Sequence, residues 1–387
     1  MHQLRASAWT LSIAAVLSFV ITACATRMCP ACGATAPSSA YEAYIVHENE
    51  LAPTLFQTFT ARSGTAKNAL ILSGGGANGA WGAGVLNGWT DRPEFDIVTG
   101  ISTGALIATY AYLGKIKDAD LMKAYTTVSD KDIFRERFLL TVPFSSSLRT
   151  TEPLETLLKR YAGDDVIQEV GKIYENERRL LFIGTVNYDS GGFVIWNLGK
   201  LAASSNPSKY EMYRKLLLAA TAIPVLFPPV VLDGAMHVDG GVREQVFGAT
   251  FAAAASEAHR AYLKSVSTSG ATGRTFETPT AYVIINGQLP VRRKCVKPEV
   301  LEIAFRAVTV LLSEGMIGNL YRLGAEMKDW MLKLSRIDDT YLLESESDRF
   351  DQKKMQRLFD AGREAGMKQS WENVPPPLTL SPLPCVD

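Results

Sequence analysis

The sequence predicts a layered α/β fold, and two observations carry this prediction. Short apolar runs alternate with helical stretches from residue 67 onward, which is typical of a sheet covered by helices. Two of these runs also lead through a glycine-rich turn directly into a helical stretch. Five runs are expected as strands, at 69–73, 96–99, 180–187, 230–238 and 281–286. Helices are expected at 78–89, 103–113, 152–161, 209–222, 245–262 and 299–334.

The N-terminal residues indicate export. Arg5 precedes an apolar run of about a dozen residues, whereas a membrane-spanning helix needs roughly 20. Ile21-Thr-Ala-Cys24 then resembles a bacterial lipobox, which implies that residues 1–23 are a lipoprotein signal peptide and that Cys24 is lipidated. Ala25 favours the outer membrane by resemblance to sorted lipoproteins. An ordinary cleaved signal with an incidental Cys24 is the alternative.

Composition excludes a nucleic-acid partner and supports a large core. The chain has 40 basic and 40 acidic side chains, and removing residues 1–23 takes away only Arg5, so no global positive field remains. A hydrophobic content of 47% over 387 residues is enough for one large α/β domain.

We expect residues 24–66 to be a tether and lead-in, 67–290 the catalytic domain, and 291–387 a helical extension packed on it. The apolar residues of 299–334 are expected to cover the sheet rather than to face lipid. Export permits disulfides among Cys29, Cys32, Cys295 and Cys385, with the pairing left open. A redox role for Cys29 and Cys32 is disfavoured because no βαβ unit surrounds them.

A glycine-rich segment, Ser73-Gly-Gly-Gly-Ala-Asn-Gly79, follows the first expected strand and opens a helix. Its glycines allow successive amides to point at one anion, and the helix N-terminus adds a favourable dipole. Gly74, Gly76 and Gly79 also satisfy a dinucleotide-binding pattern. That pattern needs an acidic residue at the end of the next strand, but Asp96 stands at its beginning. Dinucleotide binding is therefore the weaker interpretation.

Gly100-Ile-Ser102-Thr-Gly104 lies between the expected strand 96–99 and the helix 103–113. This is the G-x-S-x-G pattern of a nucleophile elbow, in which glycines permit a sharp turn that exposes the serine hydroxyl. Serine needs a base, and Asp239 in His237-Val-Asp-Gly-Gly241 offers one at a strand end. Ser102 is thus the candidate nucleophile and Asp239 the candidate base.

Together these segments resemble the patatin-like phospholipase family, in their order along the chain and through the stretch 219–229, over roughly residues 67–290. The resemblance implies a three-layer fold with a mostly parallel central sheet flanked by helices. It also implies hydrolysis of acyl esters in phospholipids or neutral lipids by a Ser-Asp dyad, without metal or cofactor. Gly74, Gly75 and Gly76 would supply the oxyanion hole. Asn78 departs from the family, which often has a basic residue at that position.

A Ser-Asp-His triad is the competing mechanism, because His259 follows Ser102 and Asp189, Asp233 or Asp239 in chain order. His237 could also approach the site. No metal-ligand spacing and no calcium-binding loop are present in the sequence.

Three functions are thus compatible with the sequence. The expected one is a phospholipase A or lysophospholipase bound to the cell envelope through its lipid, with an acyl-ester lipid as substrate. The others are a serine esterase or thioesterase acting on smaller substrates, and a non-catalytic lipid-binding lipoprotein. The sequence leaves protein partners open.

Overall fold

The computed structural model describes residues 40–374, apart from 64, 66, 139–144, 269–276, 290, 292–294 and 344–346. The expected signal peptide 1–23, the lipidation site Cys24 and the expected disulfide partners Cys29, Cys32 and Cys385 lie outside the described residues.

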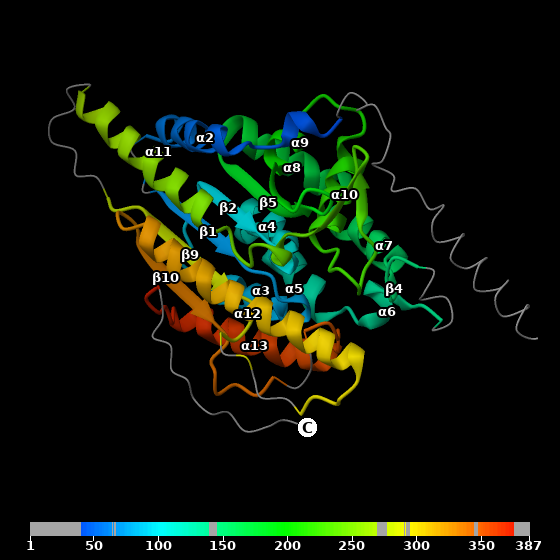
Figure 1. Ribbon diagram of the computed structural model, residues 1–387. Coiled ribbons are helices and arrows are strands. Elements are labelled where there is room, and N and C mark those ends of the chain that lie inside the picture. The colour runs from blue at the N-terminus through cyan, green and yellow to red at the C-terminus, as the bar shows by residue number, and fades with distance from the viewer. Residues whose placement is uncertain are drawn as a thin grey trace, which may run out of the picture.

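The centre of the molecule is an eight-stranded sheet with the strand order β10-β9-β1-β2-β5-β8-β7, and β6 pairs with β5 (Figure 1). The pairs β10/β9, β9/β1, β1/β2 and β2/β5 are parallel, and the other three pairs are antiparallel. The predicted mostly parallel sheet is therefore confirmed. The strands are β1 (Asn68–Leu72), β2 (Ile97–Gly100), β5 (Leu180–Asn187), β6 (Gly192–Asn197), β7 (Val230–Leu232), β8 (Ala235–Asp239), β9 (Thr280–Ile285) and β10 (Met331–Arg336).

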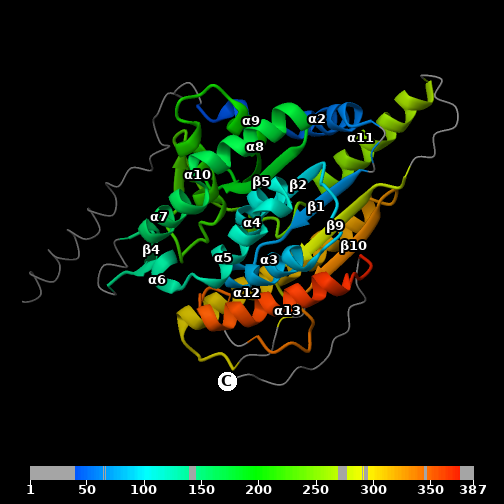
Figure 2. The same cartoon turned by 180° about the vertical axis from the view of Figure 1, so that it is seen from behind.

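Helices cover both faces of this sheet (Figures 1 and 2). They are α2 (Glu48–Ala61), α3 (Gly79–Gly88), α4 (Thr103–Leu113), α5 (Asp118–Thr126), α6 (Asp130–Ile133), α7 (Glu152–Tyr161), α8 (Asp164–Glu177), α9 (Leu198–Ala203), α10 (Lys209–Ala220), α11 (Ala249–Thr268), α12 (Val300–Glu326) and α13 (Gln352–Lys368). A small hairpin of β3 (Arg135–Glu136) and β4 (Arg149–Thr150) lies apart from the main sheet.

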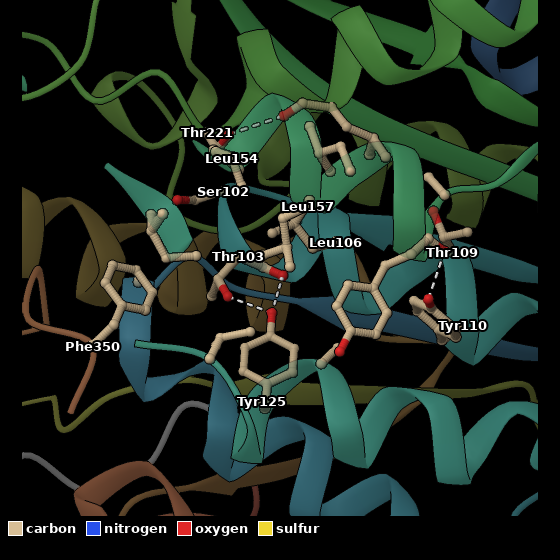
Figure 3. A pocket seen from close by; sticks show the side chains of 18 of the residues that line it. Ser102, Thr103, Leu106, Thr109, Tyr110, Tyr125, Leu154, Leu157, Thr221 and Phe350 are labelled. Carbon is tan, nitrogen blue, oxygen red and sulfur yellow. Dashed lines mark hydrogen bonds between the residues drawn. The ribbon is translucent and has the colours of Figure 1, made fainter. Parts of the chain in front are cut away.

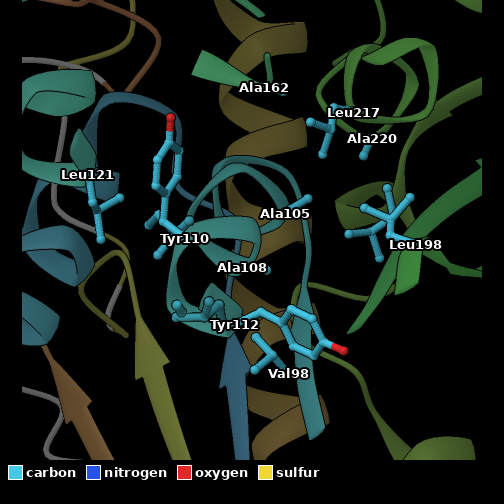
Figure 4. Close-up of a cluster of buried hydrophobic side chains, with 14 of the residues drawn as sticks. Val98, Ala105, Ala108, Tyr110, Tyr112, Leu121, Ala162, Leu198, Leu217 and Ala220 are labelled. Atoms are coloured by element: carbon cyan, nitrogen blue, oxygen red, sulfur yellow. The ribbon is translucent and has the colours of Figure 1, made fainter. Parts of the chain in front are cut away.

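The sheet separates two hydrophobic cores, because alternate side chains of a strand point to opposite faces. In β1, Leu70 and Leu72 join the core formed with α3, α4, α5, α7, α10 and α13, part of which Figure 4 shows. Ala69 and Ile71 join the other core, formed with α2, α11 and the C-terminal half of α12. This arrangement confirms the expected three layers.

Two expected elements were wrong. The strand expected at 230–238 is a hairpin of β7 and β8, which turns at Asp233 and Gly234 with φ angles of 46° and 83°. An Asp-Gly pair favours such a two-residue turn. The helix expected at 299–334 ends at Glu326, and β10 continues the chain as a strand that pairs with β9.

The apolar residues of 299–334 were expected to pack in the core, and only part of them does. Met316, Leu320, Met327 and Trp330 are buried, but Ile303, Leu311 and Met331 are 53%, 70% and 49% exposed. By length and composition, Glu302–Glu326 is apolar enough to cross a membrane, although one such helix is weak evidence.

The segments on both sides of the expected catalytic domain are built into its core. In the lead-in, α2 buries Leu51, Leu55 and Phe59 in the core shared with α11. In the C-terminal extension, β10 extends the central sheet and α13 packs along α3. The lead-in thus contributes a helix to the core, and the C-terminal extension contributes a strand as well as helices.

Candidate active site

Ser102 stands on a strained turn between β2 and α4. Its backbone has φ 53° and ψ −126°, a conformation that a residue with a side chain rarely adopts. A Cβ at Gly104 would fall 2.5 Å from the carbonyl oxygen of Ser73, and one at Gly100 would clash with the backbone of Gly104 itself. The glycines of the motif are thus required by close backbone packing, and the chain makes the sharp turn expected of the G-x-S-x-G pattern.

Asp239 ends β8, and its side chain lies next to this elbow. The residue is 3% exposed, and Oδ1 accepts a hydrogen bond from the Gly241 N–H at 2.7 Å. Burial raises the pKa of Asp239 to about 6, against the opposing effects of the Ser102 hydroxyl and the Gly241 N–H. The structure therefore brings the predicted nucleophile and base together.

One oxygen of the Asp239 carboxyl has no hydrogen-bond partner among the described residues. This oxygen, Oδ2, is buried, and no hydrogen bond of ordinary geometry joins it to Ser102. A buried acceptor without a donor is costly and rare. Oδ2 of Asp239 is therefore available to accept a hydrogen bond.

The predicted oxyanion residues need one correction. The Gly74 N–H donates to the carbonyl of Gln245 at 3.1 Å, so it is not free to bind an oxyanion. Gly75 and Gly76 have φ angles of 151° and 53°, and their N–H groups donate to no described residue. The N–H group of Thr103, at the start of α4 and next to Ser102, also donates to no described residue. Gly76 and Thr103 line the same cavity as Ser102. Gly76 and Thr103 are therefore the best-placed donors, while Gly75 stays a prediction.

Asn286, directly after β9, holds the glycine-rich segment and was not predicted from the sequence. Its side chain donates to the Ser73 carbonyl at 2.8 Å and accepts from the Gly82 N–H at 3.1 Å. Its backbone oxygen occupies the place that a Cβ at Gly75 would need. A polar residue at the carboxyl end of a central strand was the available signal for this role.

Gln245 links the glycine-rich segment to the turn after Asp239 and was also missed. Its carbonyl receives the Gly74 N–H, and its side-chain amide donates to the Gly241 carbonyl at 2.8 Å. Its own N–H donates to Asn319 Oδ1 at 3.1 Å. Nothing in the local sequence distinguishes this glutamine.

The structure does not assemble the alternative triad. His259 packs among Phe59, Tyr262 and Trp330 in the core on the α2 and α11 face of the sheet. Burial lowers its pKa, and neither it nor His237 lines the cavity at Ser102.

The other residues considered for a triad have hydrogen-bond partners other than Ser102. His237 Nδ1 lies 3.0 Å from the Thr185 hydroxyl, and burial lowers its pKa to about 4. Asp189 accepts from the Met236 N–H, and Asp233 accepts from backbone N–H groups near residue 40. Asn78 lines a separate, small pocket, so the position that departs from the family pattern does not face the Ser102 cavity.

A mostly apolar cavity opens beside Ser102 (Figure 3). The empty space in and in front of this cavity is about 890 Å³, open solvent at its mouth included. Its lining residues are Gly76, Ser102, Thr103, Leu106, Thr109, Tyr110, Ala124, Tyr125, Val128, Ile133, Leu154, Leu157, Leu158, Tyr161, Ala162, Leu217, Thr221, Ile223, Phe227, Phe350 and Met355. No cluster of metal-ligating side chains occurs among the residues that the structure describes.

Part of the chain is similar to a known family of proteins. Residues 70–247 match the family model of patatin-like phospholipases, a range that holds both Ser102 and Asp239. VipD from Legionella pneumophila is a similar solved structure, with 14% sequence identity and a TM-score of 0.39 over 78% of this chain and 66% of that one. The chain thus spans just under two thirds of VipD. A search of curated proteins found no match. The predicted patatin-like α/β fold is confirmed, and the match supports a lipid acyl hydrolase in general.

Proposed function

From the match of residues 70–247 to patatin-like phospholipases, we propose that the chain is a lipid acyl hydrolase of the phospholipase A or lysophospholipase type. Ser102 and Asp239 form its catalytic dyad. The observation that carries this proposal is the strained Ser102 at the mouth of an apolar cavity, next to a buried carboxyl whose pKa is raised to about 6.

The raised pKa of Asp239 makes the dyad chemically reasonable. A carboxylate at its ordinary pKa of about 4 is too weak a base to help a serine hydroxyl at neutral pH. Burial brings the pKa closer to the working pH while Asp239 stays mostly ionised at pH 7. Its partnerless Oδ2 is the acceptor for the Ser102 proton.

The reaction then proceeds in two balanced halves. Ser102 Oγ attacks the ester carbonyl carbon while its proton moves to Asp239. The resulting oxyanion accepts hydrogen bonds from the N–H groups of Gly76 and Thr103. The carbon–oxygen bond to the alcohol breaks, and the alcohol leaves with the proton from Asp239. Water attacks the acyl-enzyme, gives a proton to Asp239, and releases the fatty acid as that proton returns to Ser102.

A fluorophosphonate probe tests the proposal. It should phosphonylate Ser102, as located by peptide mass spectrometry, and should abolish fatty-acid release from phosphatidylethanolamine and phosphatidylglycerol vesicles. Ser190, which lies in an exposed turn, is an internal control that should stay unlabelled. Hydrolysis of short esters without any release from vesicles would indicate a small-substrate esterase. Release that persists after full labelling of Ser102 would refute the assigned nucleophile.

We also propose that lipidation of Cys24 anchors the enzyme to the outer membrane of a bacterial envelope, beside its substrate. The support is the Ile21-Thr-Ala-Cys24 motif after a signal-like segment. Two or more acyl chains anchor a protein stably, whereas one gives only marginal binding. Cys24→Ser should lose its acyl chains by mass spectrometry and leave the membrane fraction. Membrane fractionation that is unchanged in the variant would contradict the anchor.

A further inference from the structure

The cavity at Ser102 is a channel with a direction. Thr103, Leu106 and Tyr110 line it along one side of α4, at the spacing of residues on one helix face. From α7, Leu154, Leu157 and Tyr161 line it at a similar spacing. Figure 3 shows Leu154 near Ser102, Leu157 near Leu106, and Tyr110 at the opposite end. The two helices are therefore side walls that lead away from the nucleophile.

Beyond Ser102 and the N–H groups of Gly76 and Thr103, the hydroxyl groups of the lining threonines are already hydrogen-bonded within the protein. The Thr109 hydroxyl contacts the Tyr213 hydroxyl at 3.0 Å, and the Thr221 hydroxyl donates to the Leu217 carbonyl at 3.1 Å. Near Ser102, the Tyr125 and Thr103 hydroxyls bind each other at 2.6 Å. None of the buried side-chain atoms without a partner in the described part of the chain belongs to a lining residue. An apolar chain is the ligand that fits such walls without cost.

At the end away from Ser102, the cavity is lined by Tyr110, by Tyr161 at the end of α7 and by Ala162 after it. The Tyr110 hydroxyl donates to the Tyr161 carbonyl at 2.5 Å, which ties the Tyr110 ring to the end of α7. Ala162 is 4% exposed and also lines the cavity. The Tyr161 side chain is partly exposed, and its hydroxyl lies 3.5 Å from that of Thr127 near the surface. The Tyr161 ring thus separates the end of the channel from solvent.

We infer that this channel holds the acyl chain of the substrate, and that Tyr110, Tyr161 and Ala162 limit its length to about ten carbons. The inference rests on the proposed acyl hydrolysis at Ser102. Tyr110 lies eight positions after Ser102, and at a helical rise of 1.5 Å per residue this is about 12 Å. An extended alkyl chain advances about 1.25 Å per carbon, given carbon–carbon bonds of about 1.5 Å at tetrahedral angles. The channel therefore selects medium-chain acyl groups.

A series of p-nitrophenyl esters from C4 to C16 tests this limit. In the wild type, kcat/KM should increase up to about fourfold per methylene until about C10, since each buried methylene contributes about 0.8 kcal/mol. It should then stop increasing or fall. Tyr161→Ala should open the far end and raise the ratio of kcat/KM for C14 to that for C8 by about tenfold. Ala162→Leu should move the optimum about two carbons shorter.

Tyr210→Ala is the matched control, because Tyr210 is also a partly buried tyrosine but lies outside the channel. It should leave the C14 to C8 ratio unchanged. If Ala162→Leu fails to fold, the Tyr161→Ala ratio decides alone. Hydrolysis by the wild type with no optimum, or with an optimum that Tyr161→Ala does not move, would overturn the inference. No hydrolysis of any ester would instead refute the proposed function.

Discussion

Asp239 has a carboxyl that must be ionised to act and yet lies in surroundings that favour its neutral form. Burial raises its pKa to about 6, whereas the neighbouring Ser102 hydroxyl and Gly241 N–H lower it. In the proposed dyad, the same side chain therefore sets the pH range of catalysis, and its ionisation has a cost in stability.

The pH profile of kcat/KM follows from this pKa. Asp239 accepts a proton only when ionised, so kcat/KM should be constant above about pH 7 and fall about tenfold per pH unit below about pH 6. Ester hydrolysis between pH 5 and 9 measures it. Circular dichroism at each pH should accompany this measurement, to separate loss of activity from unfolding. The buried His237 has a pKa lowered from 6.5 to about 4, so the folded protein loses stability as the pH falls through this range. A midpoint near pH 4 would mean that the Asp239 carboxyl is not buried as described.

Asp239→Asn should stabilise the protein at neutral pH. The pKa of Asp239 in the folded protein, about 6, lies above the ordinary value of 3.8. The stability that the folded protein gains from keeping this carboxyl neutral is therefore fully present below pH 3.8 and is lost as the pH rises through 6. Asn keeps the acceptor for the Gly241 N–H without the charge. Urea unfolding at pH 8 should show a gain of up to about 3 kcal/mol, since one pKa unit corresponds to about 1.4 kcal/mol. At pH 4 the gain should nearly vanish, and an equal gain at both values would contradict the ionisation.

At the scale of elements, the packing of α13 on α3 depends on glycines from both helices. Cβ atoms at Gly84 and Gly88 would fall on the Phe359 and Arg363 carbonyl oxygens. Cβ atoms at Gly362 and Gly366 would fall on those of Trp81 and Val85. These glycines, four residues apart on each helix, let the two backbones touch.

Gly362→Ala should therefore destabilise the fold. The added methyl group would meet backbone that cannot move aside, and such overpacking costs about 1–3 kcal/mol. Gly315→Ala is the control, because Gly315 is an exposed position of α12 with open space around it. There alanine should gain about 0.5–1 kcal/mol from its helix propensity. Thermal unfolding measures both variants, and a Gly362→Ala variant as stable as the wild type would disprove the close packing.

The predictability of each element depended on how local its signals are. The central strands could be predicted because apolar runs are bounded by turn residues, as at 69–73 and 180–187. β10 was read as helix because its apolar residues follow those of α12 without a glycine or proline, and its partner β9 lies far away in sequence. Long-range pairing of this kind leaves no local pattern.

The same distinction holds for the site. The turns that hold Ser102 and Asp239 could be predicted, because each residue stands beside glycines that mark a tight turn in the local sequence. Asn286 could not, because its partner Ser73 is 213 residues away and a single asparagine has no distinctive spacing. The occupied Gly74 N–H was missed for the same reason, since its acceptor is Gln245.

At the scale of the whole molecule, the C-terminal segment completes both the fold and the cavity. β10 pairs with β9 at one edge of the sheet, and α13 covers α3. Phe350 and Met355 line the Ser102 cavity from beyond the range of the family match. We therefore expect that the matched domain does not fold on its own without this segment.

A chain that ends after residue 290 should lose its cooperative thermal transition and its ester hydrolysis, because it exposes the edge of β9 and the apolar side of α3. A chain that ends after residue 374 is the control and should keep both, since it retains β10 and α13. Expression of the two chains without residues 1–23, followed by calorimetry, measures the difference. A folded and active 24–290 protein would show that the C-terminal segment is an accessory.

The most direct test of the central claim compares the wild type with Ser102→Ala, Asp239→Asn and His259→Ala, all purified without residues 1–23. Hydrolysis of a short-chain ester and of phospholipid vesicles is measured at pH 8, with circular dichroism to confirm each fold. We predict that kcat/KM falls at least about a thousandfold in the first two variants and changes less than about threefold in the third. Loss of activity in a folded His259→Ala variant, or retention of it in Asp239→Asn, would contradict the Ser102–Asp239 dyad.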